Sequence, residues 1–333
     1  MKNTLSKIKF EPDNKHKLSL EVKLIQFFLR LFKTKFIMEA KMISNGFDNK
    51  PAIPKKSFYK KYSIIESNLD GRQIWELSLK EKEYNQFSNL LILFLHGGAY
   101  MANITKGHWN LIEQLLIKTK GTIIVPDYPL APYSNYLETY DFLDKLYLKI
   151  LGKYKDKKIV LMGDSAGGGL ALGFVQKLRD ERINNEKINN DRINNKENKK
   201  LSKVLPDYII LFSPWLDISM SNPDIKSIEK KDLLLTIKGL KSAAEKYAVD
   251  IDIKDFMVSP IYGDFKGLCK IAIFTGTNDI LNPDARKLKN KLEQQNIDFY
   301  YFEYPEMFHD WVIITRLKES KDAIEKVCEI LKN

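Results

Sequence analysis

The alternation of short apolar runs with longer helical stretches constrains the fold of this chain most. Six consecutive apolar residues, Leu90–Leu95, are followed by a helical pattern, and this order repeats towards the C-terminus. An uninterrupted apolar run is typical of a strand that is buried on both faces. Strands separated by helices of about ten or more residues predict a mostly parallel sheet with helices on both faces. The predicted fold class is therefore α/β.

The predicted elements extend over most of the chain. Strands are expected at residues 58–66, 74–79, 90–95, 122–125, 158–162, 208–212, 271–275 and 299–303. Helices are expected at residues 109–119, 137–151, from Ser165 onward, 236–248, 284–294 and 318–331. The turn sequence Asn68-Leu69-Asp70-Gly71 joins the first two strands and is typical of a hairpin.

Two segments interrupt this pattern. Residues 182–200 repeat an Ile-Asn-Asn unit three times and contain almost no other apolar residue. Such a composition buries too little surface to offset the entropy of ordering, so we interpret the segment as an extension of the preceding helix or a solvated surface loop without a function. Residues 217–258 separate two predicted strands, at a place where an insertion would cover the carboxyl ends of the strands.

Composition excludes several classes of protein. Hydrophobic residues make up 44% of the chain, so a large core can form and wholesale disorder is excluded. Cys269 and Cys328 cannot form a disulfide framework, and neither they nor the four scattered histidines show a spacing typical of zinc ligands, so we predict no metal and no cofactor. The chain has no uninterrupted apolar stretch of about 18 residues and no signal-peptide pattern at its N-terminus. We therefore expect a cytoplasmic location.

The positive charge is concentrated near the N-terminus. Residues 1–61 carry a net charge of +10, whereas the whole chain carries +11. A basic surface that coats nucleic acid would extend over the body of the protein, so no nucleic-acid partner is expected.

Within this basic segment, apolar residues at helical spacing alternate with basic ones. The apolar residues are Ile25, Phe28, Leu29 and Phe32, and the basic ones are Lys23, Arg30 and Lys33. This is an amphipathic helix, which either rests on anionic lipid or covers another part of the same protein with its basic face in solvent. We prefer the second interpretation, since Lys, Asn and Ile are abundant throughout.

The sequence Gly163-Asp164-Ser165-Ala166-Gly167 is the strongest catalytic signal. It follows an apolar strand and precedes a helix-forming stretch, the context in which a Gly-x-Ser-x-Gly motif exposes a nucleophilic serine on a sharp turn. The free N–H groups of the following helix would point towards the reacting centre. A glycine-rich helix start packed against a strand is the structural alternative.

A second motif, His96-Gly97-Gly98-Ala99, follows the strand Leu90–Leu95 directly. Small residues leave backbone N–H groups free, and with the N–H of Ala166 these would form an oxyanion hole. A plain glycine turn is the alternative here too, but two such elements in this order are much less expected by chance. The predicted donors are Gly98, Ala166 and either Gly97 or Ala99.

With these motifs the chain resembles the α/β-hydrolase fold and, within it, the hormone-sensitive-lipase-like carboxylesterases. The resemblance covers roughly residues 60–330 and includes HGGAY (96–100), DYPLAP (127–132), GDSAGGGLAL (163–172), SPWLDIS (213–219), GTNDILNPDARKL (276–288) and EYPEMFHDW (303–311). The family usually has a third glycine where Ala99 stands, although alanine still offers an N–H. Tyr100, Asp164 and Trp215, which belong to these motifs, are expected to bind the substrate.

The resemblance also implies a cap over the active site. In this family an N-terminal helix pair and a late insertion form the cap, which corresponds here to residues 1–56 and 217–258, with the catalytic domain at residues 57–333. The apolar set of the basic segment would then face the acyl pocket or pack on the cap. Related esterases are often dimers, so a homodimer remains open.

The remaining members of a catalytic triad follow from the order Ser, acid, His that this fold uses. Asp279 follows the strand at 271–275, and His309 is the only histidine after Ser165. Asp284 is the rival acid, but its place at a helix start has a structural explanation. We expect His96 to organise a loop, His108 to be a surface or helix-start residue, and His16 to have no role.

Together these residues predict a serine carboxylesterase that acts on short- to medium-chain acyl esters of small molecules through an acyl-enzyme. A deacetylase or amide hydrolase would use the same triad, so the sequence does not separate the two. A binding protein that has lost catalysis is the third alternative, although it would not need Ser165, Asp279 and His309 together.

Overall fold

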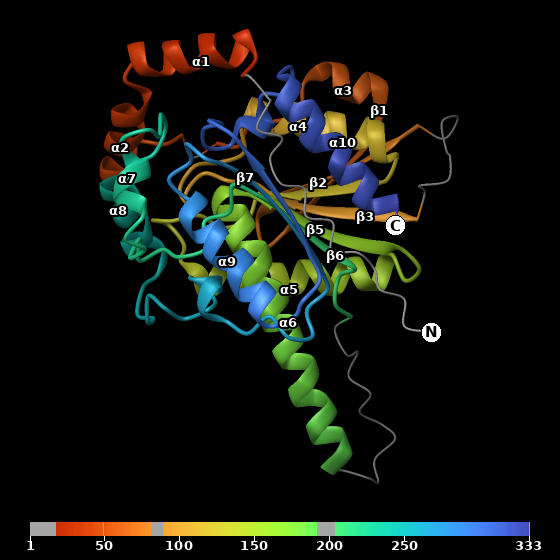
Figure 1. Cartoon of the computed structure of the whole chain (residues 1–333). Helices are drawn as coiled ribbons and strands as arrows, with labels where there is room; N and C mark the ends of the chain where they lie inside the picture. The colour runs from red at the N-terminus through yellow and green to blue at the C-terminus, as the bar shows by residue number, and fades with distance from the viewer. Residues whose placement is uncertain (1–17, 49, 81–88, 192–203, 333) are drawn as a thin grey trace, which may run out of the picture.

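The computed structural model describes residues 18–48, 50–80, 89–191 and 204–332, and its centre is one eight-stranded sheet (Figure 1). The strand order is β1-β2-β4-β3-β5-β6-β7-β8. β1 and β2 pair antiparallel, β2 pairs antiparallel with β4, and all other neighbours are parallel. The strands are β1 Tyr62–Leu69, β2 Arg72–Leu79, β3 Leu90–Leu95, β4 Thr122–Pro126, β5 Lys158–Asp164, β6 Tyr208–Phe212, β7 Lys270–Gly276 and β8 Phe299–Tyr304. The predicted α/β fold with a mostly parallel sheet is confirmed.

Helices cover both faces of the sheet. They are α1 Leu20–Leu31, α2 Thr34–Ser44, α3 Lys56–Lys61, α4 Lys106–Thr119, α5 Tyr136–Lys153, α6 Ser165–Asp191, α7 Ile225–Glu229, α8 Ile237–Tyr247, α9 Asn282–Gln294 and α10 Lys318–Lys332, with 3-10 turns at Pro260–Tyr262 and Trp311–Ile313. α3, α4 and α10 contribute to the core on one face, and α5, α6 and α9 to the core on the other. β3 shows why two cores form, because its alternate residues point to opposite sides of the sheet. Leu91, Leu93 and Leu95 join the first core, and Leu90, Ile92 and Phe94 the second.

The first predicted strand begins later than the sequence pattern indicated. Residues 58–61 belong to α3, and β1 starts at Tyr62. Phe58 is buried, its ring centroid 5.6 Å from that of Tyr62 and 6.5 Å from that of Trp109. The aromatic residues of this segment fit a helix or a strand equally well, and the packing of Phe58 on Trp109 accompanies the helical choice. The predicted hairpin turn is present, with Asp70 and Gly71 both at positive φ.

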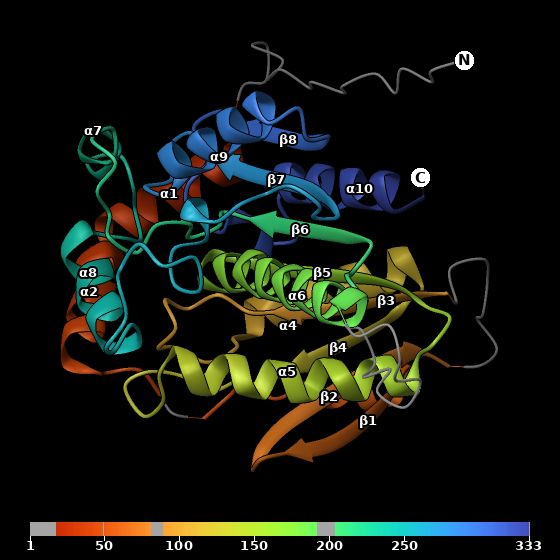
Figure 2. The same cartoon turned by 90° about the horizontal axis from the view of Figure 1, so that it is seen from below.

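The two interrupting segments have different structures. α6 continues to Asp191, so the first part of the Asn-rich segment extends the preceding helix, and it projects from the body in Figure 1; residues 192–200 lie outside the described residues. The segment at 217–258 contains α7 and α8. The arrowheads of β6 and β7 in Figure 2 point towards the group formed by α2, α7 and α8, and α2 packs on α8. These helices therefore lie over the carboxyl ends of the strands.

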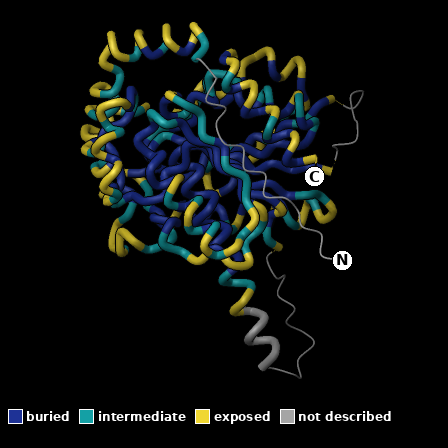
Figure 3. Tube along the Cα trace, in the orientation of Figure 1, coloured by how far each residue is buried: buried dark blue, intermediate teal, exposed yellow. Residues whose placement is uncertain are grey.

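The N-terminal helix covers its own protein with only one of its faces. Ile25 and Leu29 are half-buried against the core that contains Val22, as the preferred interpretation requires. Phe28 and Phe32 differ from the expectation that the whole apolar set is covered, because both side chains are exposed to solvent. Figure 3 shows the outward side of α1 and α2 as a nearly continuous exposed strip. His16 lies outside the described residues.

Candidate active site

Ser165 stands on the sharp turn between β5 and α6. Its φ of +51° lies in the left-handed region, a strained conformation for a residue with a side chain. Its carbonyl accepts a hydrogen bond of 2.8 Å from the N–H of Trp215. The flanking glycines permit this turn, because a Cβ at Gly163 would lie 2.4 Å from the Gly167 carbonyl oxygen and one at Gly167 would lie 2.0 Å from that of Leu95. The close approach of the helix to the strands thus places the serine hydroxyl above the ends of the strands.

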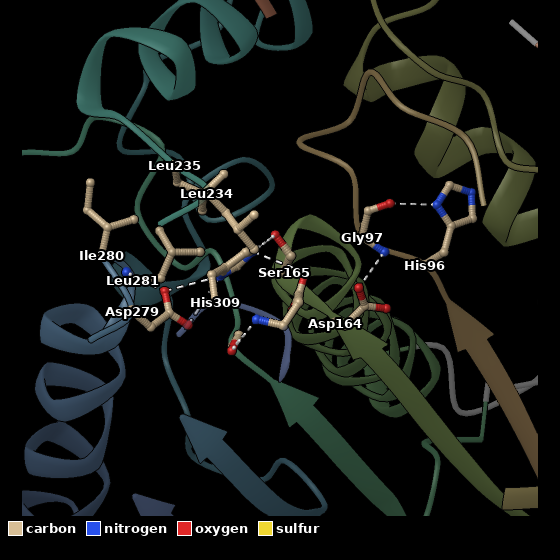
Figure 4. Close-up of polar contacts among 12 residues, drawn as sticks. His96, Gly97, Asp164, Ser165, Leu234, Leu235, Asp279, Ile280, Leu281 and His309 are labelled. Atoms are coloured by element: carbon tan, nitrogen blue, oxygen red, sulfur yellow. Dashed lines mark hydrogen bonds and ion pairs between the residues drawn. The ribbon is translucent and has the colours of Figure 1, made fainter. Parts of the chain in front are cut away.

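A histidine from one neighbouring loop contacts this hydroxyl, and an aspartate from another loop contacts the histidine. Nε2 of His309, in the loop after β8, lies 2.9 Å from Ser165 Oγ. Nδ1 of His309 lies 3.1 Å from both carboxylate oxygens of Asp279, in the loop after β7 (Figure 4). All three side chains are buried. The structure therefore brings together the serine, histidine and acid that the sequence predicted, with the nitrogens of His309 facing opposite partners.

A second carboxylate touches His309. Asp310 Oδ2 lies 3.1 Å from Nε2 of His309. Burial lowers the pKa of His309, but the charges of Asp310 and Asp279 outweigh it and raise this pKa well above its ordinary value. Burial in turn raises the pKa of Asp310 to about 6. Sequence reasoning missed Asp310, although a carboxylate directly after the predicted histidine was a usable signal.

The rival acid lies elsewhere. Asp284, in the first turn of α9, accepts a hydrogen bond of 2.9 Å from Asn222 Nδ2, and burial raises its pKa to about 6. The carboxylate that contacts His309 from this region is therefore Asp279, not Asp284.

Asp232 joins the segment 217–258 to the loop after β7 that contains Asp279, a contact that sequence reasoning missed. Its Oδ1 accepts hydrogen bonds of 2.8 Å from the N–H groups of Leu234 and Leu235, and its Oδ2 accepts one of 2.7 Å from Ile280 N–H, next to Asp279. Burial and the neighbouring Asp279 charge raise the pKa of Asp232 to about 6. Figure 4 shows that Leu234 and Leu235 lie beside Ser165 and His309, on the side away from the strands. The position of Asp232 depends on the fold of the insertion, so no sequence signal pointed to it.

The glycine loop after β3 approaches Ser165 closely. Gly98 has a φ of +126°, and a Cβ there would lie 2.4 Å from the Ala102 carbonyl oxygen, so only glycine fits. Ala99 has a φ of +52° and keeps the turn left-handed without a third glycine. Gly97 differs from the prediction, because its N–H donates a 3.0 Å hydrogen bond to Asp164 Oδ2 and is not free for an oxyanion. Of the predicted loop donors, Gly98 and Ala99 remain.

Comparison with known proteins places this geometry in a family. A model described as the alpha/beta hydrolase fold matches residues 92–313. The chain belongs to the α/β-hydrolase fold family. An esterase from Acinetobacter venetianus is 28% identical over 242 residues, covering 72% of this chain and 73% of that protein. An acetyl-hydrolase from Streptomyces hygroscopicus is 27% identical over 221 residues, covering 66% of this chain and 67% of that protein.

Solved structures share the fold of this α/β hydrolase. An esterase/lipase from an uncultured bacterium superimposes with a TM-score of 0.74 at 22% identity, covering 94% of this chain and 98% of that one. An esterase from the bacterial hormone-sensitive lipase family has a TM-score of 0.73 at 20% identity, covering 95% of this chain and 98% of that one. The predicted fold is thus confirmed, and the relatives named esterase and acetyl-hydrolase agree with the ester-hydrolase class that the predicted resemblance implies.

A buried ion pair supports the glycine loop of this hydrolase. Asp164 Oδ2, which holds Gly97 N–H, also lies 3.0 Å from Nε2 of His108. Burial alone would raise the pKa of Asp164, but the charge and hydrogen bond of His108 outweigh that effect and lower it. Burial alone would lower the pKa of His108, but the charge and hydrogen bond of Asp164 outweigh that effect and raise it. His108 is buried at the start of α4, where it forms a capping box with Thr105, so it is a helix-start residue and not a surface one. Asp164 is fully buried and its Oδ2 contacts Gly97 and His108, so its role in substrate binding stays a prediction.

His96 organises the loop, as predicted. Its Nδ1 lies 2.8 Å from the Gly97 carbonyl oxygen, and its ring stacks on Tyr128 with centroids 4.5 Å apart. Burial and the neighbouring His108 lower the pKa of His96 to about 4, so the ring is neutral near pH 7.

The other two predicted substrate residues form an aromatic stack. The ring of Tyr100 lies 5.6 Å from Trp215 and 3.8 Å from Tyr247 of α8, the latter pair nearly parallel. All three side chains are buried. The stack joins the glycine loop to Tyr247 of α8, and substrate binding by Tyr100 and Trp215 stays a prediction. Within the part of the chain that the structure describes, no group of three His, Cys, Asp or Glu side chains is arranged to hold a metal ion.

Proposed function

We propose that this α/β hydrolase is a serine carboxylesterase that cleaves short- to medium-chain acyl esters. The ester-hydrolase class rests on the family and on relatives named esterase and acetyl-hydrolase. The single observation that carries the catalytic assignment is the chain of contacts from Ser165 Oγ through His309 to Asp279, at 2.9 and 3.1 Å. The distance of 2.9 Å between Ser165 Oγ and His309 Nε2 lies within the reach of a proton transfer between nucleophile and base.

The reaction would begin with attack by Ser165. Its Oγ forms a bond to the ester carbonyl carbon while His309 Nε2 accepts the hydroxyl proton, and Asp279 stabilises the resulting imidazolium from the Nδ1 side. The tetrahedral intermediate collapses by breaking the bond to the alcohol oxygen, which takes the proton from His309. Water then attacks the acyl-enzyme by the same steps and releases the acid together with free Ser165.

The developing oxyanion needs donors that are not already bonded to the protein. We assign Gly98, Ala99 and Ala166, since Ala166 lies in the first turn of α6 and Gly98 and Ala99 follow β3 at the same edge of the sheet. Gly97 would act indirectly, because its hydrogen bond to Asp164 fixes the loop. Loss of one oxyanion donor typically lowers kcat by about 10²–10³.

The acyl group would lie against the insertion. Leu234 and Leu235 lie beside the Ser165 hydroxyl in Figure 4, and Asp232 fixes their backbone. Leucine side chains close to the nucleophile favour an apolar acyl chain. Because α2, α7 and α8 cover this end of the sheet, we expect a chain of limited length.

The test is hydrolysis of p-nitrophenyl esters from acetate to dodecanoate by the wild-type protein and by Ser165→Ala. We expect turnover that is highest for the shorter esters and is abolished by the substitution. A maximum at long acyl chains would contradict the acyl range but not the triad. Equal rates for both proteins, with circular dichroism showing that both are folded, would overturn the catalytic assignment and favour a binding role.

A deacetylase or amide hydrolase is the second candidate, because one of the relatives is named an acetyl-hydrolase. Comparing p-nitrophenyl acetate with p-nitroacetanilide separates the two, since both release a chromophore and differ in the scissile bond. Faster turnover of the anilide would favour the second candidate.

A further inference from the structure

α1 has apolar side chains on two opposite faces. Val22 and Gln26 are buried, and Ile25 and Leu29 lie half-buried beside them. On the other side lie five large apolar side chains that are each 49–73% exposed; they form the outer face, which consists of Leu20, Leu24, Phe27, Phe28 and Leu31. Their spacing of three and four residues follows the helical repeat. The inner face accounts for the packing of α1 on the protein, so the outer face needs another explanation.

The apolar surface continues beyond α1. Phe32, and then Phe36, Ile37 and Ile43 of α2, are exposed by 41–63%. The rings of Phe27 and Phe28 lie 5.6 Å apart, and those of Phe28 and Phe32 lie 6.1 Å apart. We call the outer face of α1 together with Phe32, Phe36, Ile37 and Ile43 the apolar strip. Among the described residues, all four exposed phenylalanines (Phe27, Phe28, Phe32 and Phe36) belong to this strip. A contiguous exposed apolar surface of this kind marks an interaction site rather than scattered exposure.

Basic side chains border this strip. Lys23 and Arg30 are exposed on α1, Lys33 lies between the helices, and Lys41 is exposed on α2. They belong to the segment 1–61, which carries +10 of the net charge of +11. Phenylalanine and leucine flanked by lysine and arginine are the composition of helices that lie in the interface of an anionic bilayer. A symmetric contact with a second copy would instead bring these like charges together.

The strip is attached to the loops of the catalytic centre. Gln26 Nε2 of α1 donates a 2.9 Å hydrogen bond to the carbonyl of Glu306, three residues before His309. Lys35 of α2 bonds the carbonyl of Glu229, three residues before Asp232. Within the described residues no helix is long and apolar enough to span a bilayer. α1 has 12 residues, so it would lie along the membrane surface.

We propose that the outer face of α1, together with the exposed side of α2, docks this protein on an anionic lipid bilayer. Phe27, Phe28 and Phe32 would enter the boundary between headgroups and acyl chains, and Lys23 and Arg30 would remain at the level of the phosphates. The docked helices would hold the active-site end of the sheet towards the membrane. This proposal does not depend on the catalytic assignment.

The test is co-sedimentation of the full-length Ser165→Ala protein with vesicles, so that hydrolysis plays no part in the readout. Vesicles of phosphatidylcholine alone are compared with vesicles containing one quarter phosphatidylglycerol. We expect binding to the anionic vesicles that falls at 0.5 M NaCl. In Phe27→Glu/Phe28→Glu we expect a loss of roughly tenfold or more, because two rings that would enter the bilayer are removed and two negative charges that the anionic lipid repels are added. A matched control, Leu137→Glu/Leu148→Glu, changes two exposed apolar residues of α5 and should bind like the parent.

Three results would overturn the proposal. The first is no binding to anionic vesicles, and the second is equal loss in the α5 control. The third is a dimer in analytical ultracentrifugation that Phe27→Glu/Phe28→Glu dissociates, without vesicle binding, which would assign the face to a second copy. Thermal unfolding of both double variants shows that they are folded, and p-nitrophenyl ester hydrolysis by the same substitutions in the wild-type background tests the catalytic assignment separately.

Discussion

Asp310 Oδ2 lies 3.1 Å from Nε2 of His309, the same nitrogen that faces Ser165 Oγ at 2.9 Å. A protonated His309 can therefore donate to a carboxylate on its serine side as well as to Asp279 on the other. A base that is held protonated cannot accept the Ser165 proton. Asp310 thus acts as a positioning residue that opposes the base form of His309 in the pH range where the Asp310 carboxylate is charged.

Substitution Asp310→Asn should move the acid limb of the pH profile to lower pH. The pKa of His309 is raised well above its ordinary value partly by Asp310, whose own pKa of about 6 leaves it charged where His309 titrates. Removing that charge lowers the pKa of His309, so His309 remains neutral down to a lower pH. The measurement is kcat/KM for p-nitrophenyl acetate against pH. An unchanged acid limb would show that Asp310 has no influence on His309.

The two candidate acids can be separated by one pair of isosteric substitutions. Asp279→Asn removes the carboxylate that contacts Nδ1 of His309 and should lower kcat by about 10⁴. Asp284→Asn replaces a carboxyl that contacts Asn222 and should leave kcat within a few-fold of wild type. Both are measured on p-nitrophenyl acetate near pH 8. The reverse order of effects would transfer the acid role to Asp284.

The aromatic stack should couple the insertion to the glycine loop. Tyr247→Ala removes the ring that lies 3.8 Å from Tyr100, and a buried aromatic truncation typically destabilises by about 3–5 kcal/mol. If the stack also positions the loop that holds Gly98, kcat falls while Tyr247→Phe, which keeps the ring, retains wild-type turnover. Urea unfolding and steady-state kinetics on both variants check this. Wild-type kcat in a folded Tyr247→Ala protein would limit the stack to stability.

Much of the fold could be predicted because its signals are local. The uninterrupted apolar run Leu90–Leu95 becomes a central strand with the predicted bounds, and Gly163 and Gly167 predict the turn at Ser165 because no side chain fits there. The exception, residues 58–61, is a place where the same aromatic residues fit a helix or a strand and packing on Trp109 decides.

Contacts between distant segments could not be predicted in this way. Asp164 and His108 are 56 residues apart, and Asp232 and Ile280 are 48 apart, so only the folded chain shows that each pair meets. Gly97 and Gly98 look alike in sequence, and a single hydrogen bond to Asp164 separates a loop-fixing N–H from a free donor. The exposed side of α1 escaped prediction for a similar reason, since helical spacing alone does not tell which apolar face is covered.

The buried pair of His108 and Asp164 should give this protein a pH-dependent stability that one substitution removes. Nε2 and Oδ2 lie 3.0 Å apart with both side chains nearly inaccessible. Removing one partner of a buried ion pair typically destabilises by about 3–5 kcal/mol, so His108→Gln should lower the free energy of unfolding by that order at pH 6.

The sign of the pH effect follows from the two pKa directions. The pKa of His108 is raised, since Asp164 outweighs burial, so its contribution is fully present below the unfolded value and is lost as pH rises through the raised one. The pKa of Asp164 is lowered, since His108 outweighs burial, so its contribution is lost only as pH falls through that lowered value. The difference in unfolding free energy between wild type and His108→Gln should therefore be greatest on the mildly acidic side and shrink at alkaline pH. Urea unfolding of both proteins from pH 5 to 10 measures it, and a difference that stays constant would show that the pair is not ionised in the folded protein.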